Sequence, residues 1–73
     1  MKRFDMNIVA ERLKILRQER NIGQNRLADE IGVSNASISY WENAKQLPSI
    51  EALFKLSVYY EVPCDYILGL IDD

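Results

Sequence analysis

Residues 24–49 read QNRLADEIGVSNASISYWENAKQLPS, and this segment contains two short helical patterns joined by a turn. In the first pattern, about residues 24–31, apolar residues recur at the spacing of one buried helical face: Leu27, Ala28 and Ile31. Gly32 is expected to end this helix, because glycine adopts positive φ at little steric cost. Ser34 is a suitable N-cap for the helix that follows. Together these features predict a helix-turn-helix over about residues 24–43.

The second of these helices, about residues 35–43, has two contrasting faces when it is laid out at roughly 100° per residue. One side is expected to point inward and carries Ile38, Trp41 and Glu42. The opposite side is small, polar and without acidic residues: Asn35, Ala36, Ser37, Ser39, Tyr40 and Asn43. Such a face can approach a phosphate-lined groove without like-charge repulsion. It is therefore a candidate DNA-reading surface, and the alternative is an ordinary solvated helix face.

The rest of the chain also predicts helices, and no convincing period-2 strand pattern appears. A first helix over about residues 6–20 has a buried stripe of Val9, Leu13 and Leu16, with Asn21 as a left-handed cap. A later helix, capped by Ser49, reaches about Tyr60, and its expected inner face is Ile50, Leu53, Ser57 and Tyr60. Pro63 suits the first turn of a last helix, which ends near Gly69. We therefore expect an all-α, compact five-helix bundle.

Composition limits the classes of function. Cys64 is the only cysteine and there is no histidine, so an intrachain disulfide is impossible and a metal site is not expected. Since there is also no nucleophile–base pair and no phosphate loop, we expect neither an enzyme nor a cofactor. No apolar run approaches the roughly 18 residues of a membrane helix, and the N-terminal pattern is not a secretory signal. The expectation is one cytoplasmic domain over residues 1–73 without a membrane partner.

The net charge of −2 is unevenly distributed along the chain. Residues 1–47 carry eight Lys and Arg against six Asp and Glu, whereas residues 48–73 carry one Lys against five acids. Contact with phosphates depends on local charge rather than on the total. The distribution thus permits nucleic-acid binding by the first two thirds of the chain without demonstrating it.

Residues 24–49 closely resemble the Cro/repressor-type (XRE-like) helix-turn-helix family of bacterial and phage transcriptional regulators. Members share the pattern Q-x-x-L-A-x-x-x-G-V-S-x-x-x-I-S-x-[WY]-E-x-G-x-x-x-P, and LKILR (residues 13–17) and CDYILG (residues 64–69) look like the family's flanking segments. The resemblance covers about residues 8–70. It implies a lambda-repressor-like fold and a sequence-specific DNA-binding regulator, expected to be a repressor. Two positions differ from the residues usual in the family. Gly23, just before the pattern, stands where Ser or Thr is usual, and Ala44 stands at the position of the Gly after the third helix.

The resemblance also implies roles for individual residues. Asn35, Ala36 and Tyr40 would meet base edges, with Ser37 as a weaker candidate. Gln24 would bind a phosphate and brace the recognition helix, and the further backbone contacts would be Ser34, Ser39, Asn43, Lys45, Gln46 and Arg17. Arg17 and Glu42 would form a partly buried ion pair, the alternative being two unrelated surface charges. Because the outward face has no Arg or Lys, we expect an A·T-leaning site rather than guanine readout.

One recognition helix reads only a few base pairs, so such proteins commonly dimerise on pseudo-palindromic operators. We expect a homodimer whose two-fold interface uses residues of the last helix and of the segment that follows it: Tyr66, Leu68, Leu70 and Ile71. The exposed side of the fourth helix is expected to contribute as well. The alternative is that these residues complete the core.

Three classes of function stay open at this point. We favour a free-standing regulator, because nothing after Asp73 supplies a sensor or oligomerisation domain. The second class is an antitoxin or restriction-system controller with the same fold. The third is a protein-interaction module that has lost DNA binding, which the negative net charge favours.

Overall fold

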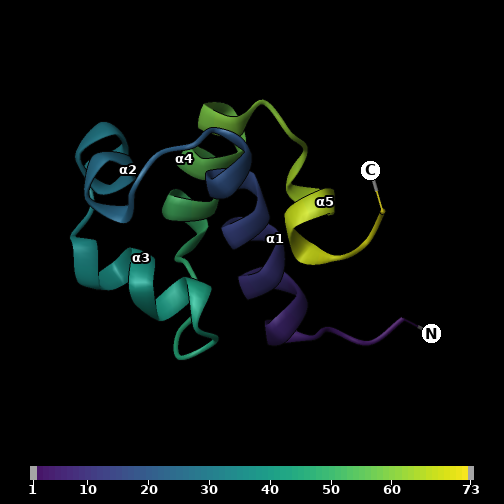
Figure 1. The fold of residues 1–73 in the computed structure, drawn as a ribbon. Coiled ribbons are helices and arrows are strands. Elements are labelled where there is room, and N and C mark those ends of the chain that lie inside the picture. Colours follow the sequence, from purple (N-terminus) through teal and green to yellow (C-terminus); the bar gives the residue numbers. More distant parts are fainter. Residues whose placement is uncertain (1, 73) are drawn as a thin grey trace.

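The computed structural model describes residues 2–72, which form five helices and no strand (Figure 1). The helices are α1 (Met6–Glu19), α2 (Gln24–Ile31), α3 (Asn35–Glu42), α4 (Ile50–Tyr60) and α5 (Cys64–Leu68). The all-α, five-helix prediction is therefore confirmed, and each helix lies within about one residue of its expected bounds. Within residues 2–72, none of these helices combines the length and the apolar character needed to cross a membrane.

The helix ends follow from local backbone chemistry. Three N-cap side chains accept a hydrogen bond from a backbone N–H of the first turn, as expected for Ser and Asp: Asp5, Ser34 and Ser49. The chain leaves its helices through residues with positive φ: Asn21, Gly32, Ala44, Glu61 and Gly69. Glycine takes this conformation readily and asparagine is the next best, so the predicted left-handed caps at Asn21 and Gly32 are confirmed.

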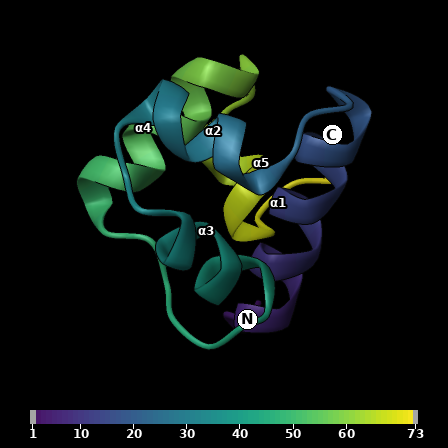
Figure 2. The ribbon, with the colours of Figure 1, turned by 60° about the vertical axis from the view of Figure 1, so that its left-hand side comes forward.

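The core draws side chains from all five helices around α1. Its most deeply buried members include Leu13 of α1, Leu27 of α2, Ile38 of α3, Leu56 of α4 and Ile67 of α5. Helix α1 packs against α3 and α5, while α2 packs against α3 and α4. Figure 2 shows how α2 and α3 stand together on one side of this core, with α5 behind them. Helices α2 and α3 are therefore held in place by a packed core.

The predicted inner face of α4 is partly wrong. Ile50 was expected inside but is 89% exposed, and the buried residues are Ala52, Leu56 and Tyr60, with Leu53 partly buried. Two stripes on this helix have the same spacing of four residues, one through Ala52 and one through Ile50. Both satisfy the helical period, so the sequence alone does not decide which one packs inward.

Candidate nucleic-acid interface

The turn between α2 and α3 is closed by main-chain and side-chain hydrogen bonds. The N–H groups of Gly32 and Val33 both donate to the carbonyl of Ala28, at 2.9 and 3.0 Å. Gly32 has φ of 74°, which permits the reversal at the end of α2. Ser34 then starts α3, and its Oγ accepts from the N–H of Ser37 at 3.1 Å. The turn thereby fixes the angle at which α3 leaves α2.

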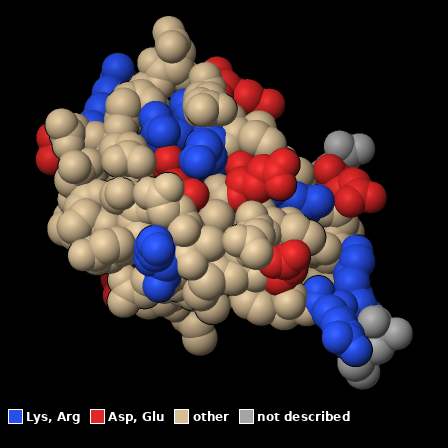
Figure 3. Space-filling model, turned by 60° about the horizontal axis from the view of Figure 1, so that its bottom comes forward, with Lys and Arg blue, Asp and Glu red and all other residues tan. Residues whose placement is uncertain are grey.

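Helix α3 has the two faces that the sequence predicts. Ile38, Trp41 and Glu42 are buried against the core. Asn35 and Ala36 are exposed, Tyr40 is 50% exposed, and Ser37 and Ser39 are half-buried at the sides. Figure 3 views the molecule from below, the side on which α3 lies in Figure 1, and the surface there is largely uncharged, broken by separate basic and acidic groups. No described segment covers this face, so it is open to a ligand.

The end of α3 is held by a Schellman-type arrangement. The N–H of Lys45 donates to the carbonyl of Tyr40 at 2.9 Å, and the N–H of Ala44 donates to that of Trp41 at 3.4 Å. Ala44 has φ of 56°, a conformation that glycine usually supplies. Asn43 Nδ2 donates to the carbonyl and the Oγ of Ser39, at 2.8 and 3.2 Å. This segment carries exposed Lys45 and Gln46 out beside the open face of α3.

A charged cluster beneath α3 joins the first three helices. Arg17 of α1 donates from Nε to Glu42 Oε2 at 2.8 Å and from Nη2 to Glu42 Oε1 at 3.0 Å, while Nη1 donates to the carbonyl of Ile22 at 2.9 Å. Gln24 of α2 donates to Glu42 Oε1 at 3.2 Å. The bond to Glu42 raises the pKa of Arg17 above its ordinary value, although burial opposes this shift. Arg17 and Glu42 are thus paired, and the alternative of two unrelated surface charges is excluded.

The structure adds one residue that the sequence did not single out. Lys14 of α1 is exposed and lines a shallow hollow together with Asn7, Glu11, Asn43 and Ala44. The helical period showed only that Lys14 faces away from the buried stripe of α1. Its position beside the end of α3 depends on how the two helices pack, which no short-range pattern reports.

The residues expected at the dimer interface divide into two groups. Tyr66 and Leu68 are half-buried, and the guanidinium of Arg12 lies 4.6 Å from the centre of the Tyr66 ring. Leu70 and Ile71 are exposed beyond the end of α5. Arg12 also donates to the carbonyl oxygens of Tyr66 and Ile71, which holds the tail against α1. Tyr66 and Leu68 therefore serve the fold at least in part, whereas Leu70 and Ile71 leave apolar surface outside.

The family described as helix-turn-helix matches residues 13–67 of the chain. The chain belongs to the helix-turn-helix family. This finding confirms the resemblance deduced from residues 24–49. It also agrees with the geometry, because the match includes both helices of the motif and the supporting segments of α1, α4 and α5.

Similar proteins include a transcriptional activator and a phage repressor. The chain is 36% identical to the HTH-type transcriptional regulator YobD of Bacillus subtilis, covering 86% of this chain and 56% of that protein. It is 38% identical to the HTH-type transcriptional activator BcrR of Enterococcus faecalis, covering 81% of this chain and 29% of that protein. The crystal structure of the P22 c2 repressor with a synthetic operator superposes with a TM-score of 0.79 and 37% identity, covering 82% of this chain and 91% of that one. The chain thus spans just over half of the length of YobD and less than a third of the length of BcrR.

Proposed function

We propose that the chain binds double-stranded DNA sequence-specifically and represses transcription by occupying an operator. The observation that carries the proposal is the open outward face of α3, on which the half-exposed Tyr40 stands beside Asn35 and Ala36 with no carboxylate among them. Family membership supports the same reading, as does the likeness to a repressor whose structure includes a synthetic operator. An acid-free helix of this width suits the major groove.

The base contacts are proposed for the outward residues of α3. The Asn35 amide can donate to and accept from adenine in a bidentate manner, and the Ala36 methyl group can pack on the methyl group of thymine. Tyr40 can pack on thymine with its ring or donate its hydroxyl to a phosphate. Ser37 is a weaker candidate, because its Oγ lies 2.9 Å from the Oγ of Ser34 and shares a hydrogen bond with it. The resulting preference is A·T-leaning.

The contacts to the DNA backbone are proposed for residues of α1, α2 and α3 and of the turns before and after α3. Arg17 uses three of its five N–H donors on Glu42 and Ile22, so two stay available for a phosphate. Lys45, just past the end of α3, and Lys14, which lines the hollow beside that end, are exposed ammonium groups. The other proposed contacts are Gln24, Ser34, Ser39, Asn43 and Gln46. Such contacts fix the register of the protein on the duplex but carry no sequence information.

The functional unit is proposed to be a homodimer on a pseudo-palindromic operator, located in the cytoplasm and without catalytic activity. Two copies related by a two-fold axis can each read one half-site, with the half-sites about one helical turn apart. This arrangement compensates for the few base pairs that a single α3 can contact.

Selection of bound sequences from a random DNA pool tests the proposal. The expected result is an A·T-rich motif repeated with two-fold symmetry, whose binding weakens steeply as salt is raised. Tyr40→Ala should lower the affinity for the selected sequence by about tenfold or more, within the range of a lost base contact. The control Phe4→Ala removes an exposed aromatic ring outside α3 and should leave the affinity unchanged. No salt-sensitive enrichment of any sequence would instead favour a protein-interaction module.

Whether the chain represses or activates transcription needs its own measurement, because one similar protein is named an activator. A reporter gene placed behind a promoter that overlaps the selected motif should fall in expression when the chain is supplied. An increase at every position of the motif relative to the promoter would contradict repression.

A further inference from the structure

The outer face of α4 carries an apolar stripe on the surface of the described chain. Ile50, Phe54 and Val58 follow one another at intervals of four residues and are 89%, 65% and 62% exposed. This spacing keeps the three side chains on one side of the helix over about 12 Å of its axis. Single exposed apolar residues are ordinary, but a contiguous row of three large ones marks an interaction surface.

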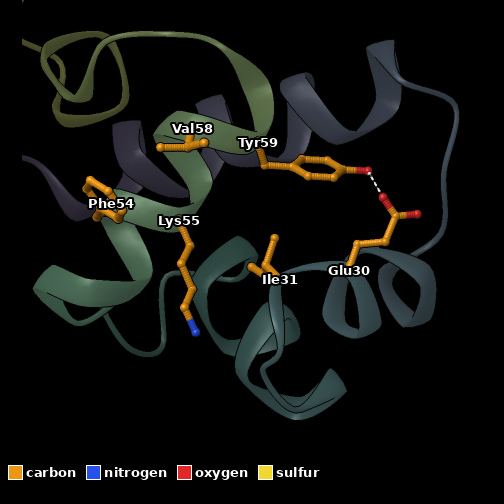
Figure 4. Close-up of a pocket in the computed structure, with 6 residues that line it drawn as sticks. All are labelled: Glu30, Ile31, Phe54, Lys55, Val58 and Tyr59. Atoms are coloured by element: carbon orange, nitrogen blue, oxygen red, sulfur yellow. Dashed lines mark hydrogen bonds between the residues drawn. The ribbon is translucent and has the colours of Figure 1, made fainter.

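Two opposite charges follow one side of this stripe. Glu51 and Lys55 lie one turn apart, and Lys55 Nζ is 3.8 Å from Glu51 Oε2. Lys55 also borders a shallow, mainly apolar groove between α2 and α4, together with Glu30, Ile31, Phe54 and Val58. Figure 4 shows the Lys55 side chain leaving α4 and extending beside Ile31, so that its ammonium group ends near the mouth of the groove. An acidic group arriving from outside can reach it there.

We propose that this face of α4 binds a second copy of the chain, with the two α4 helices antiparallel and related by a two-fold axis beside Phe54. In that register Phe54 packs against its counterpart, and Ile50 lies opposite the partner's Val58. Glu51 and the partner's Lys55 lie on the same side of the helix pair, separated by about 3 Å along the axis. The two-fold axis generates the reciprocal pair, so each copy contributes one donor and one acceptor.

The charge pattern selects both the occupant and its direction. In a parallel pair related by a two-fold axis, Glu51 and Lys55 would lie on the opposite side of the seam from their counterparts and face the flank with Leu53 and Ser57, so neither would gain an opposite charge. A partner with a surface of a single charge sign would leave one of the two residues opposed by a like charge. Of these arrangements, the antiparallel copy alone matches both charges while covering the whole stripe.

This inference takes the homodimer from the proposed function and assigns its surface to α4 rather than to the tail residues Leu70 and Ile71. It does not depend on DNA binding, because the association is expected in the free chain. A stripe of three side chains per copy is small compared with stable interfaces, so the dimer is expected to dissociate in the micromolar range or above.

Charge exchange across the proposed axis gives the sharpest test. Glu51→Lys places a lysine opposite the partner's Lys55, and Lys55→Glu places a glutamate opposite the partner's Glu51. Each variant alone should therefore associate about tenfold or more weakly than the original chain in sedimentation equilibrium, since two attractive pairs become repulsive. An equimolar mixture of the two variants should recover the dimer, because each lysine then faces a glutamate. Only a contact between residue 51 and residue 55 of different copies predicts this recovery.

The control Glu19→Lys makes the same charge change at an exposed position of α1 and should leave the association unchanged. Thermal unfolding of every variant checks that the fold is kept. Association of both single variants at the original strength, or no recovery in the mixture, would overturn the α4 surface. A chain that stays monomeric up to millimolar concentration would overturn the homodimer itself, whereas a failed DNA selection would leave both intact.

Cross-linking provides a second measurement that detects a weak dimer. In a Cys64→Ser background, Phe54→Cys should be linked to its counterpart by a short bis-maleimide, because both thiols lie beside the two-fold axis. Leu70→Cys in the same background tests the tail. Rapid linkage through residue 70 and none through residue 54 would transfer the interface to the tail and overturn the proposal.

Discussion

Glu42 on the buried side of α3 accepts hydrogen bonds from both Nε and Nη2 of Arg17 on α1, and this pair sets the rotation of α3. The Glu42 side chain is only 2% exposed, so Arg17 supplies most of the compensation for its charge. Gln24 of α2 donates to the same carboxylate. Because the opposite side of α3 is the proposed reading face, the pair links the stability of the fold to the placement of Asn35, Ala36 and Tyr40.

Glu42→Gln should lower the free energy of unfolding by roughly 2–4 kcal/mol, because it leaves Arg17 partly buried without its counter-ion. Chemical denaturation measures this change. The matched control is Glu51→Gln, which removes a carboxylate from an exposed pair and should cost less than about 0.5 kcal/mol. Stability of Glu42→Gln within experimental error of the original chain would contradict a structural role for the pair.

Ala44→Gly should raise the free energy of unfolding by about 1 kcal/mol. Ala44 adopts φ of 56° in the Schellman turn after α3, and a residue with a Cβ is strained there by about 1–2 kcal/mol. The added flexibility of glycine in the unfolded chain offsets part of this gain. Ala10→Gly, in the interior of α1, is the control and should destabilise the fold. A loss of stability in Ala44→Gly would show that the strain is relieved elsewhere.

Most of the fold could be predicted from the sequence because its helix ends depend on short-range chemistry. Ser34, Gly32 and Asn21 act through their own side chains or backbone freedom, so their roles are visible without coordinates. The face of α4 could not be predicted, since Ile50 and Ala52 head two stripes of equal spacing. Only packing against α2 and α5 selects between them.

The candidate site divides in the same way. The outward face of α3 followed from its helical period, because one side of the helix is apolar apart from Glu42. The contacts of Lys14 and Gln24 lay outside what helical period and spacing report, because other helices create them. The bond from Gln24 to Glu42 depends on the packing of α2 against α3, and the position of Lys14 depends on the packing of α1 against α3.

Tyr60→Phe should leave the free energy of unfolding unchanged or raise it by up to about 1 kcal/mol. The Tyr60 hydroxyl is buried and has no hydrogen-bond partner among the described residues, so its removal relieves a desolvation cost. Denaturant titration near neutral pH measures the effect. Tyr59→Phe is the control, because its hydroxyl donates to Glu30 at 2.7 Å and its loss should be slightly destabilising. A clear loss of stability in Tyr60→Phe would indicate that the hydroxyl has a partner in solution.

Alkaline pH should destabilise the chain in part through Tyr60. Burial raises the pKa of Tyr60 above its ordinary value of 10.0, so the folded state keeps a proton that the unfolded state releases. The contribution of Tyr60 to stability is therefore complete below about pH 10 and is lost as the pH rises further, by at most about 1.4 kcal/mol per pH unit. Tyr60→Phe should flatten the dependence of unfolding free energy on pH above 10. An unchanged slope in this variant would contradict the shift.

Two glycines of the motif should respond in opposite ways to serine. Gly23 caps α2 with φ of −82°, and a Cβ there would meet no atom within 4 Å, so Gly23→Ser fits without strain and supplies the missing hydroxyl cap. We expect it to raise the free energy of unfolding by a few tenths of a kcal/mol. Gly32 has φ of 74°, and Gly32→Ser should cost about 1 kcal/mol although space for the side chain exists. Thermal unfolding of the two variants side by side measures both signs. Equal effects would mean that backbone conformation does not control this turn.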